Sequence, residues 1–146
     1  MILKKVAVLL AALLLLTSCA ATEPEPLSSL SQYETQELKW RDCYGNYQCS
    51  SLLVPIDYAD LSVGAFSLSL LRYQALDQDR RIGSLVVNPG GPGSSGVDYA
   101  YNAEYIVSPE ILERFDIVGF DPRGVGDSAA IKCLSDAETD ASFAAD

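Results

Sequence analysis

The segment with the clearest chemical potential is glycine-rich and runs from Val87 to Gly96. It reads Val-Asn-Pro-Gly-Gly-Pro-Gly-Ser-Ser-Gly and follows an apolar run directly. Glycines at the end of a strand let backbone N–H groups approach an anion or a developing alkoxide closely. Three chemistries therefore compete for this loop: binding of a dinucleotide pyrophosphate, presentation of a nucleophilic serine, and stabilisation of an oxyanion.

The dinucleotide interpretation rests on residues 91–96, which satisfy G-x-G-x-x-G, and on two acidic residues near the usual offset for a ribose carboxylate. Those acidic residues are Asp116 and Asp121. Pro92 counts against this interpretation, because it removes a backbone N–H where the pyrophosphate needs donors. We therefore expect no dinucleotide cofactor.

The nucleophile interpretation rests on residues 92–96, which nearly match G-x-S-x-G. A nucleophile of this kind sits on the sharp turn at the end of a strand, whereas Ser94 lies six residues past Asn88. The oxyanion interpretation suits both the position and the composition of the loop. A glycine-proline loop with no chemical role remains the alternative, because these residues punctuate loops everywhere.

The chain of 146 residues contains no histidine. A Ser-His-acid mechanism needs an imidazole to take the serine proton and pass it to the leaving group. A zinc site would have to rely on thiols for which other roles are predicted below. We therefore expect no complete catalytic triad, no metal site and no cofactor within these residues.

The N-terminus is typical of an exported lipoprotein. Two lysines precede an apolar run of 11 residues, 6–16, which as a helix would rise only about 16 Å. Spanning a bilayer takes roughly 20 residues, so this pattern predicts a signal peptide over residues 1–18. Cys19 follows Leu-Thr-Ser, which resembles a bacterial lipobox and predicts lipidation of that cysteine. An ordinary cleavage site with a chance cysteine is the alternative.

Residues 19–38 contain Glu-Pro-Glu-Pro and several serines, and they predict a flexible tether before a folded part over residues 39–146. Without residues 1–18 the chain carries 8 basic and 20 acidic side chains, a net charge of −12. Such a surface disfavours nucleic acid as a partner. We expect a location in the cell envelope, lipid-anchored to the outer face of the membrane, or secretion.

Export also permits disulfides. Cys43 and Cys49 flank a segment in which Gly45-Asn46 can reverse the chain, and this predicts a disulfide between them. Cys133 is then left without a partner, which suggests a partner elsewhere.

Four short runs are typical of β-strands. Residues 52–56 and 65–73 predict an antiparallel meander, while residues 84–88 and 115–121 are continuous and rich in Val and Ile, as buried parallel strands tend to be. A helix-compatible stretch over residues 97–107 lies between the last two runs. The order predicts an α/β fold with two leading strands before a βαβ unit.

Four motifs together resemble the exported tripeptidyl aminopeptidases, which are relatives of prolyl aminopeptidase in the α/β-hydrolase family. They are Trp40 with Cys43 and Cys49, Val54-Pro55-Ile56-Asp57-Tyr58, Asn88-Pro89-Gly90-Gly91-Pro92-Gly93, and the run from Gly119 to Ser128. The match extends from about Trp40 to Cys133 and keeps the family's order and spacing. This resemblance implies an α/β-hydrolase with a Ser-Asp-His triad that removes short peptides or single residues from the N-termini of peptides.

The resemblance also implies roles for individual residues. The Gly-Gly-Pro-Gly loop supplies an oxyanion donor in that family, which assigns this role to Gly91, with Gly90 beside it. Prolyl aminopeptidases have a histidine just before the two glycines, where this chain has Pro89, so the loop is similar to that of the tripeptidyl branch.

The run from Asp121 to Ser128 resembles the Asp-x-Arg-Gly-x-Gly-x-Ser turn that follows the fourth strand in these hydrolases, and we predict an architectural role for it. We expect Arg123 to bridge loops through bidentate hydrogen bonds, and Gly124 and Gly126 to adopt backbone conformations closed to other residues. The family's triad acid follows its nucleophile in chain order, which disfavours Asp121 as that acid.

The family's nucleophile follows a fifth strand that these residues do not include. The resemblance therefore predicts an N-terminal portion of a hydrolase, truncated before the nucleophile strand and not catalytically complete. The catalytic triad is expected beyond Asp146, the last residue of this sequence, and peptide substrates are expected to bind only the full-length protein.

This truncation has three expected consequences. The strand over residues 84–88 should have an unpaired apolar edge, and we expect aggregation or partial folding. Cys133 is predicted to pair with a cysteine beyond Asp146. The alternative is a noncatalytic envelope lipoprotein that uses a hydrolase-derived half-domain for binding.

Overall fold

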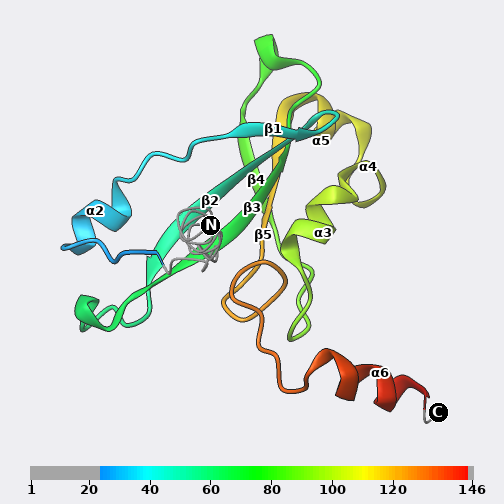
Figure 1. Ribbon diagram of the computed structural model, residues 1–146. Coiled ribbons are helices and arrows are strands. Elements are labelled where there is room, and N and C mark those ends of the chain that lie inside the picture. Colours follow the sequence, from blue (N-terminus) through cyan, green and yellow to red (C-terminus); the bar gives the residue numbers. More distant parts are fainter. Residues whose placement is uncertain (1–23, 145–146) are drawn as a thin grey trace, which may run out of the picture.

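The computed structural model describes residues 24–144, and their centre is a five-stranded sheet in the order β1-β2-β3-β5-β4 (Figure 1). The strands are β1 (Arg41–Tyr44), β2 (Tyr47–Pro55), β3 (Ala65–Tyr73), β4 (Gly83–Val87) and β5 (Phe115–Phe120). The pairs β1-β2, β2-β3 and β3-β5 are antiparallel, whereas β4 and β5 are parallel. This mixed sheet with its helices confirms the predicted α/β class.

Three short helices connect β4 to β5, namely α3 (Gly96–Tyr101), α4 (Ala103–Ile106) and α5 (Pro109–Arg114). The predicted helical stretch over residues 97–107 is therefore present but divided. The division falls at Asn102, whose side-chain amide donates to the carbonyl of Asp98 at 2.8 Å and whose backbone N–H donates to the carbonyl of Tyr99 at 3.1 Å. These local bonds replace continued helical hydrogen bonding.

The hydrophobic core lies between the sheet and this crossover, where Tyr73, Ala103, Leu112 and Ile117 form one buried cluster. The strand β4 occupies one edge of the described sheet, and Val86 on it is 61% exposed. An unpaired apolar edge at this strand is what the sequence predicts.

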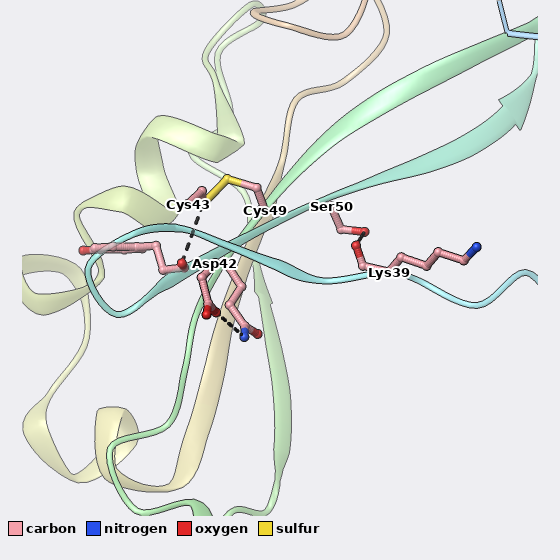
Figure 2. Close-up of a disulfide and its surroundings, with 7 residues drawn as sticks. Lys39, Asp42, Cys43, Cys49 and Ser50 are labelled. Carbon is pink, nitrogen blue, oxygen red and sulfur yellow. Dashed lines mark hydrogen bonds between the residues drawn. A yellow bond between two sulfur atoms is a disulfide. The ribbon is translucent and has the colours of Figure 1, made fainter.

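The first hairpin joins β1 to β2, at the position where the sequence predicts only a chain reversal at Gly45-Asn46. Gly45 has φ +49°, a conformation that favours glycine and permits the tight turn. The structure joins Cys43 to Cys49 in the predicted disulfide, with their Cα atoms 5.8 Å apart (Figure 2). Beside it, the amide of Gln48 donates to Asp42 at 2.9 Å, so β1 is held as a short edge strand.

Replacing Cys43 and Cys49 together with serine is expected to lower the free energy of unfolding by about 2 kcal/mol, because a crosslink over so short a loop removes limited chain entropy. The two cysteines are only six residues apart. Urea unfolding followed by circular dichroism measures the change, with the exposed Cys133→Ser as the control. An unaltered midpoint in the double variant would contradict this account of the hairpin.

The second half of the segment predicted as a flexible tether, residues 19–38, contains a helix and packs on the sheet. Helix α2 (Leu30–Glu34) buries Tyr33, and Gln36 follows it. The side chain of Gln36 donates to the carbonyl of Leu53 at 2.8 Å and accepts from the N–H of Leu53 at 2.9 Å. A glutamine side chain thus substitutes for a missing strand partner at β2, which holds this part of the segment on the sheet.

The acidic end of the chain also contains a helix that the sequence analysis did not predict, α6 (Asp136–Ala144), drawn away from the sheet in Figure 1. Ser135 and Glu138 form a reciprocal capping box: the Ser135 N–H donates to the Glu138 carboxylate at 2.8 Å and the Glu138 N–H to the Ser135 hydroxyl at 3.3 Å. Among residues 24–144, the remaining helical turns are the 3₁₀ segments η1 (Leu61–Val63) and η2 (Gln78–Arg80).

Several predictions concern the two ends of the chain. Within residues 24–144, no helix is long and apolar enough to cross a bilayer. The predicted signal peptide and Cys19 lie outside the described residues. Asp146, beyond which the triad is expected, also lies outside them, so the predicted folded part over residues 39–146 is described only as far as Ala144. Cys133 is exposed and is bonded to no cysteine in the described part of the chain.

Candidate functional site

Two loops leave the sheet at the carboxyl ends of neighbouring strands, one after β4 and one after β5. They are the glycine loop, residues 88–95, and the aspartate turn, residues 121–128. Because β4 and β5 are parallel and Val87 pairs with Gly119, both loops begin beside each other. The carboxyl ends of neighbouring parallel strands are where α/β proteins place their ligand-binding loops.

The glycine loop depends on backbone conformations that favour glycine. Gly90, Gly91 and Gly93 have φ of +82°, +130° and +92°. A Cβ atom on Gly91 would lie 2.9 Å from the backbone nitrogen of Gly93, so the turn has no space for a side chain there. The sequence pattern Gly-Gly-Pro-Gly is therefore required by the local geometry.

The two predicted oxyanion donors differ in what their N–H groups contact. The N–H of Gly90 donates to the side-chain oxygen of Asn88 at 3.1 Å, which closes an Asx turn at the strand end. For the N–H of Gly91, the described residues offer no acceptor. Gly91 is thus the better candidate for the donor role, and that role stays a prediction.

Asp121 joins the two loops. Its carboxylate is buried, and one oxygen accepts from the Ser95 hydroxyl at 2.5 Å and from the Val97 N–H at 3.2 Å. The other oxygen accepts from the Asp127 N–H at 3.1 Å. The Asp121 N–H donates to the carbonyl of Ser69 on β3 at 3.0 Å. This carboxylate therefore ties the glycine loop and the aspartate turn to the sheet.

The aspartate turn is shaped by its two glycines and by Ser128. Gly124 and Gly126 have φ of +81° and +50°, and a Cβ on Gly126 would lie 2.1 Å from a carboxylate oxygen of Asp121. Ser128 is fully buried, and its hydroxyl accepts from the Ser69 N–H at 2.8 Å. These contacts explain why the motif needs glycine and serine where it has them.

The contacts of Arg123 differ from the bidentate hydrogen bonds that the sequence predicts. No hydrogen bond to its guanidinium is found among residues 24–144, and the group lies over two rings instead, 5.4 Å from the centroid of Tyr58 and 5.7 Å from that of Phe66. A planar cation stacks readily on aromatic faces. Arg123 therefore links the turn to β3 and the preceding loop through its ring contacts.

Neither acidic residue of the dinucleotide interpretation is available for a ribose. The oxygens of Asp121 are occupied as described. Asp116, at the start of β5, accepts from Arg81 at 2.8 Å, from Arg72 at 3.4 Å and from the Ala75 N–H at 3.0 Å. Burial alone would raise the pKa of Asp116, but the hydrogen bonds from Arg81 and Ala75 and the two positive charges outweigh it and hold the pKa below its usual value.

The serines of the loop do not form an activated nucleophile. The Ser95 hydroxyl donates a hydrogen bond to Asp121, and its oxygen accepts one from the N–H of Asp98 at 2.9 Å as the N-cap of α3. Ser94 is exposed and follows the turn at residues 91–93, seven residues after Val87, which ends β4. The described part of the chain also contains no group of three or more His, Cys, Asp or Glu residues placed to hold a metal ion.

Neither Ser95 nor Ser128 has a predicted role of its own, although the run that ends at Ser128 has a predicted architectural role. The pattern Ser95-x-x-Asp98 before a helix is a capping signature and could have identified Ser95. Ser128 ends the Asp-x-Arg-Gly-x-Gly-x-Ser motif, but the motif does not reveal its partner, because the hydrogen bond from the Ser69 N–H depends on the position of β3 relative to the turn.

Comparison with known proteins finds relatives that are named as hydrolytic enzymes. The serine protease Hip1 of Mycobacterium tuberculosis is 42% identical over 115 residues, which are 72% of this chain and 22% of that protein. Carboxylesterase B of the same species is 48% identical over 96 residues, 64% of this chain and 18% of that protein. The tripeptidyl aminopeptidase of Streptomyces lividans is 36% identical over 110 residues, 69% of this chain and 20% of that protein.

No protein-family model matches the chain. The chain spans about a fifth of the length of the relatives it matches.

Proposed function

Because this chain is an α/β-hydrolase homologue over 69% to 72% of its length, as its similarity to Hip1 and to the tripeptidyl aminopeptidases establishes, we propose that it forms the oxyanion-binding part of a serine exopeptidase. The names of the relatives support hydrolysis as the type of reaction. Release of short peptides from peptide N-termini is the finer proposal, and it follows the tripeptidyl aminopeptidase relatives.

The observation that carries the proposal is the backbone of the glycine loop. A tetrahedral intermediate of acyl transfer concentrates negative charge on one oxygen, and a preorganised N–H aimed at that oxygen lowers the barrier. Gly91 presents an N–H that the described residues leave without an acceptor, at the carboxyl end of β4. The neighbouring Gly90 N–H, by contrast, is engaged within the loop.

The remaining catalytic groups must come from elsewhere. Acyl transfer by a serine needs a nucleophile, an imidazole base and an acid that orients it. These 146 residues contain no histidine, so they cannot supply the base. We propose that all three groups belong to residues beyond Asp146. We also propose that the protein is exported and anchored to the membrane through lipidated Cys19.

The test uses a fluorophosphonate probe, which labels activated serines. An antibody against this chain should detect a protein larger than 15.7 kDa, the mass of these 146 residues, and the probe should label that protein. That protein should hydrolyse a tripeptide anilide with a free amino group and leave the N-acetylated anilide intact. A product of 15.7 kDa or less that is abundant in cells and never labelled would support the noncatalytic lipoprotein instead.

Within the labelled product, Gly91→Ala is expected to lower kcat about 10- to 100-fold, because displacing one oxyanion donor weakens transition-state binding. KM should change little, since the donor acts on charge that develops only in the transition state. Gly45→Ala is the matched control: its φ is also positive, at +49°, but it lies in the first hairpin with no atom within 4 Å of a new Cβ. Equal losses in both variants would refute a specific role for Gly91.

A further inference from the structure

We propose that Asp121 is a positioning residue for the glycine loop, and that through Ser95 it fixes where the N–H of Gly91 points. This inference rests on the proposed function of Gly91 and adds a cause for the geometry of that donor. Asp121 does not reach the reacting atoms in this account. It acts through the loop.

The glycine loop is held at both ends. At its start, Val87 pairs with Gly119 in the sheet and Asn88 closes the Asx turn on Gly90. At its end, the Ser95 hydroxyl donates to Asp121 at 2.5 Å. Gly91 lies between these two attachments. Release of the second attachment would leave the donor fixed from one side only.

Asp121 suits this role because of what holds it. The residue directly follows β5, and its N–H donates to Ser69 on β3, so its backbone position is set by the sheet. Its carboxylate then accepts hydrogen bonds from Ser95 of the glycine loop, from Val97 at the start of α3 and from Asp127 of the aspartate turn. Hydrogen bonds to an ionised acceptor are about twice as strong as neutral ones. The carboxylate thus fixes the position of the glycine loop relative to the sheet.

This arrangement couples the two loops. A Cβ on Gly126 would lie 2.1 Å from the Asp121 oxygen that Asp127 contacts, and its nearest neighbours would all be atoms of that carboxylate. Gly126→Ala must therefore displace the carboxylate. The three atoms nearest to the new methyl group all belong to Asp121, so any effect on the glycine loop has to act through this carboxylate. A change in the turn should in this way loosen Gly91.

Ser95 has a second role that the experiment must separate, because it also caps α3. Ser95→Thr keeps both the donor and the cap. Ser95→Asp keeps an acceptor for the cap but loses the proton donated to Asp121 and adds a repelling charge. Ser29→Ala is the matched control for capping alone, since Ser29 caps α2 in the same way and belongs to the segment that packs on β2.

The experiment measures the NMR order parameter of the Gly91 N–H in the catalytically complete protein. Ser95→Asp and Gly126→Ala should lower it from a rigid value near 0.85 to below about 0.6, while Ser95→Thr and Ser29→Ala should leave it unchanged. Unaltered chemical shifts along β2 and β3 show that the variants remain folded. An unchanged order parameter in Ser95→Asp would overturn the proposal, as would equal loosening in Ser29→Ala.

A second measurement separates this inference from the proposed function. In the catalytically complete protein, Ser95→Asp should lower kcat about tenfold with KM nearly constant, and Ser95→Thr should restore it. If the order parameter falls and kcat does not, the positioning role stands and the oxyanion role of Gly91 fails. If kcat falls while the order parameter holds, the positioning role is refuted.

Discussion

Gly119→Ala is expected to prevent stable folding of this protein. The residue lies in β5 where α3 crosses the sheet, and a Cβ atom there would lie 1.9 Å from the carbonyl oxygen of Gly96 and 2.7 Å from the Cβ of Ala100. The first neighbour is backbone, so rotation of a side chain cannot make room. The helix would have to leave the sheet, which would also separate Ser95 from Asp121.

The expected loss in the free energy of unfolding exceeds about 4 kcal/mol, because the overlap involves two packed backbones at the buried crossing. Urea unfolding followed by circular dichroism measures it. Gly83→Ala is the matched control, since Gly83 lies in the neighbouring strand β4, has no positive φ, and would place its Cβ with nothing within 4 Å. Similar stabilities for the two variants would show that α3 does not approach β5 this closely.

A reciprocal variant tests the same contact from the helix. A Cβ on Gly96 would lie 2.1 Å from the carbonyl oxygen of Phe120. Gly96→Ala should therefore be about as damaging as Gly119→Ala, and the double variant should cost much less than the sum, because both changes break one interface.

Four of the five strands in the described residues could be predicted, because each contains a local apolar pattern, whereas β1 could not. The run over residues 115–121 is continuous and apolar, and β5 covers almost the same range. The leading runs are also present, although β2 begins at Tyr47, five residues before its prediction. The early part of β2 is polar and half-buried, with Ser50 buried, and β1 is polar and mostly exposed, so the apolar-polar alternation that signals a strand is absent from both. Their pairing depends on the disulfide and the tight turn.

The two candidate loops could be located from their motifs, but their connection could not. The sequence places Ser95 and Asp121 26 residues apart, and only the parallel register of β4 and β5 brings them together. Arg123 illustrates the same limit, because a prediction from its donor geometry missed two rings supplied by Tyr58 and Phe66. Contacts between loops depend on the register of the strands that precede them, and the motifs do not specify this register.

The second large effect is expected for Asp116→Asn, at the opposite end of β5 from the candidate site. The Asp116 side chain is 2% exposed and pairs with Arg72 from β3 and with Arg81, which follows η2. Loss of its charge leaves two partly buried cations without their common counterion. The free energy of unfolding should fall by about 3 kcal/mol, at the lower end of the range for a broken buried pair because both arginines retain some contact with water.

The matched control is Asp77→Asn, which breaks the pair between Asp77 and Arg80. Those side chains are 29% and 61% exposed, so water replaces much of the interaction and stability should change little. A loss at Asp77 as large as that at Asp116 would contradict the importance of burial. Urea unfolding at neutral pH measures both variants.

The same ion cluster predicts a dependence on pH. Because the pKa of Asp116 is lower in the folded protein than its ordinary value of 3.8, its carboxylate stabilises the fold above that pH. This contribution is lost as the pH falls through the lowered value in the folded state. The difference in stability between the wild-type protein and Asp116→Asn should therefore be full at neutral pH and shrink progressively below about pH 4. A difference that stays constant through this acidic range would show that the Asp116 carboxylate owes its effect to packing and not to its charge.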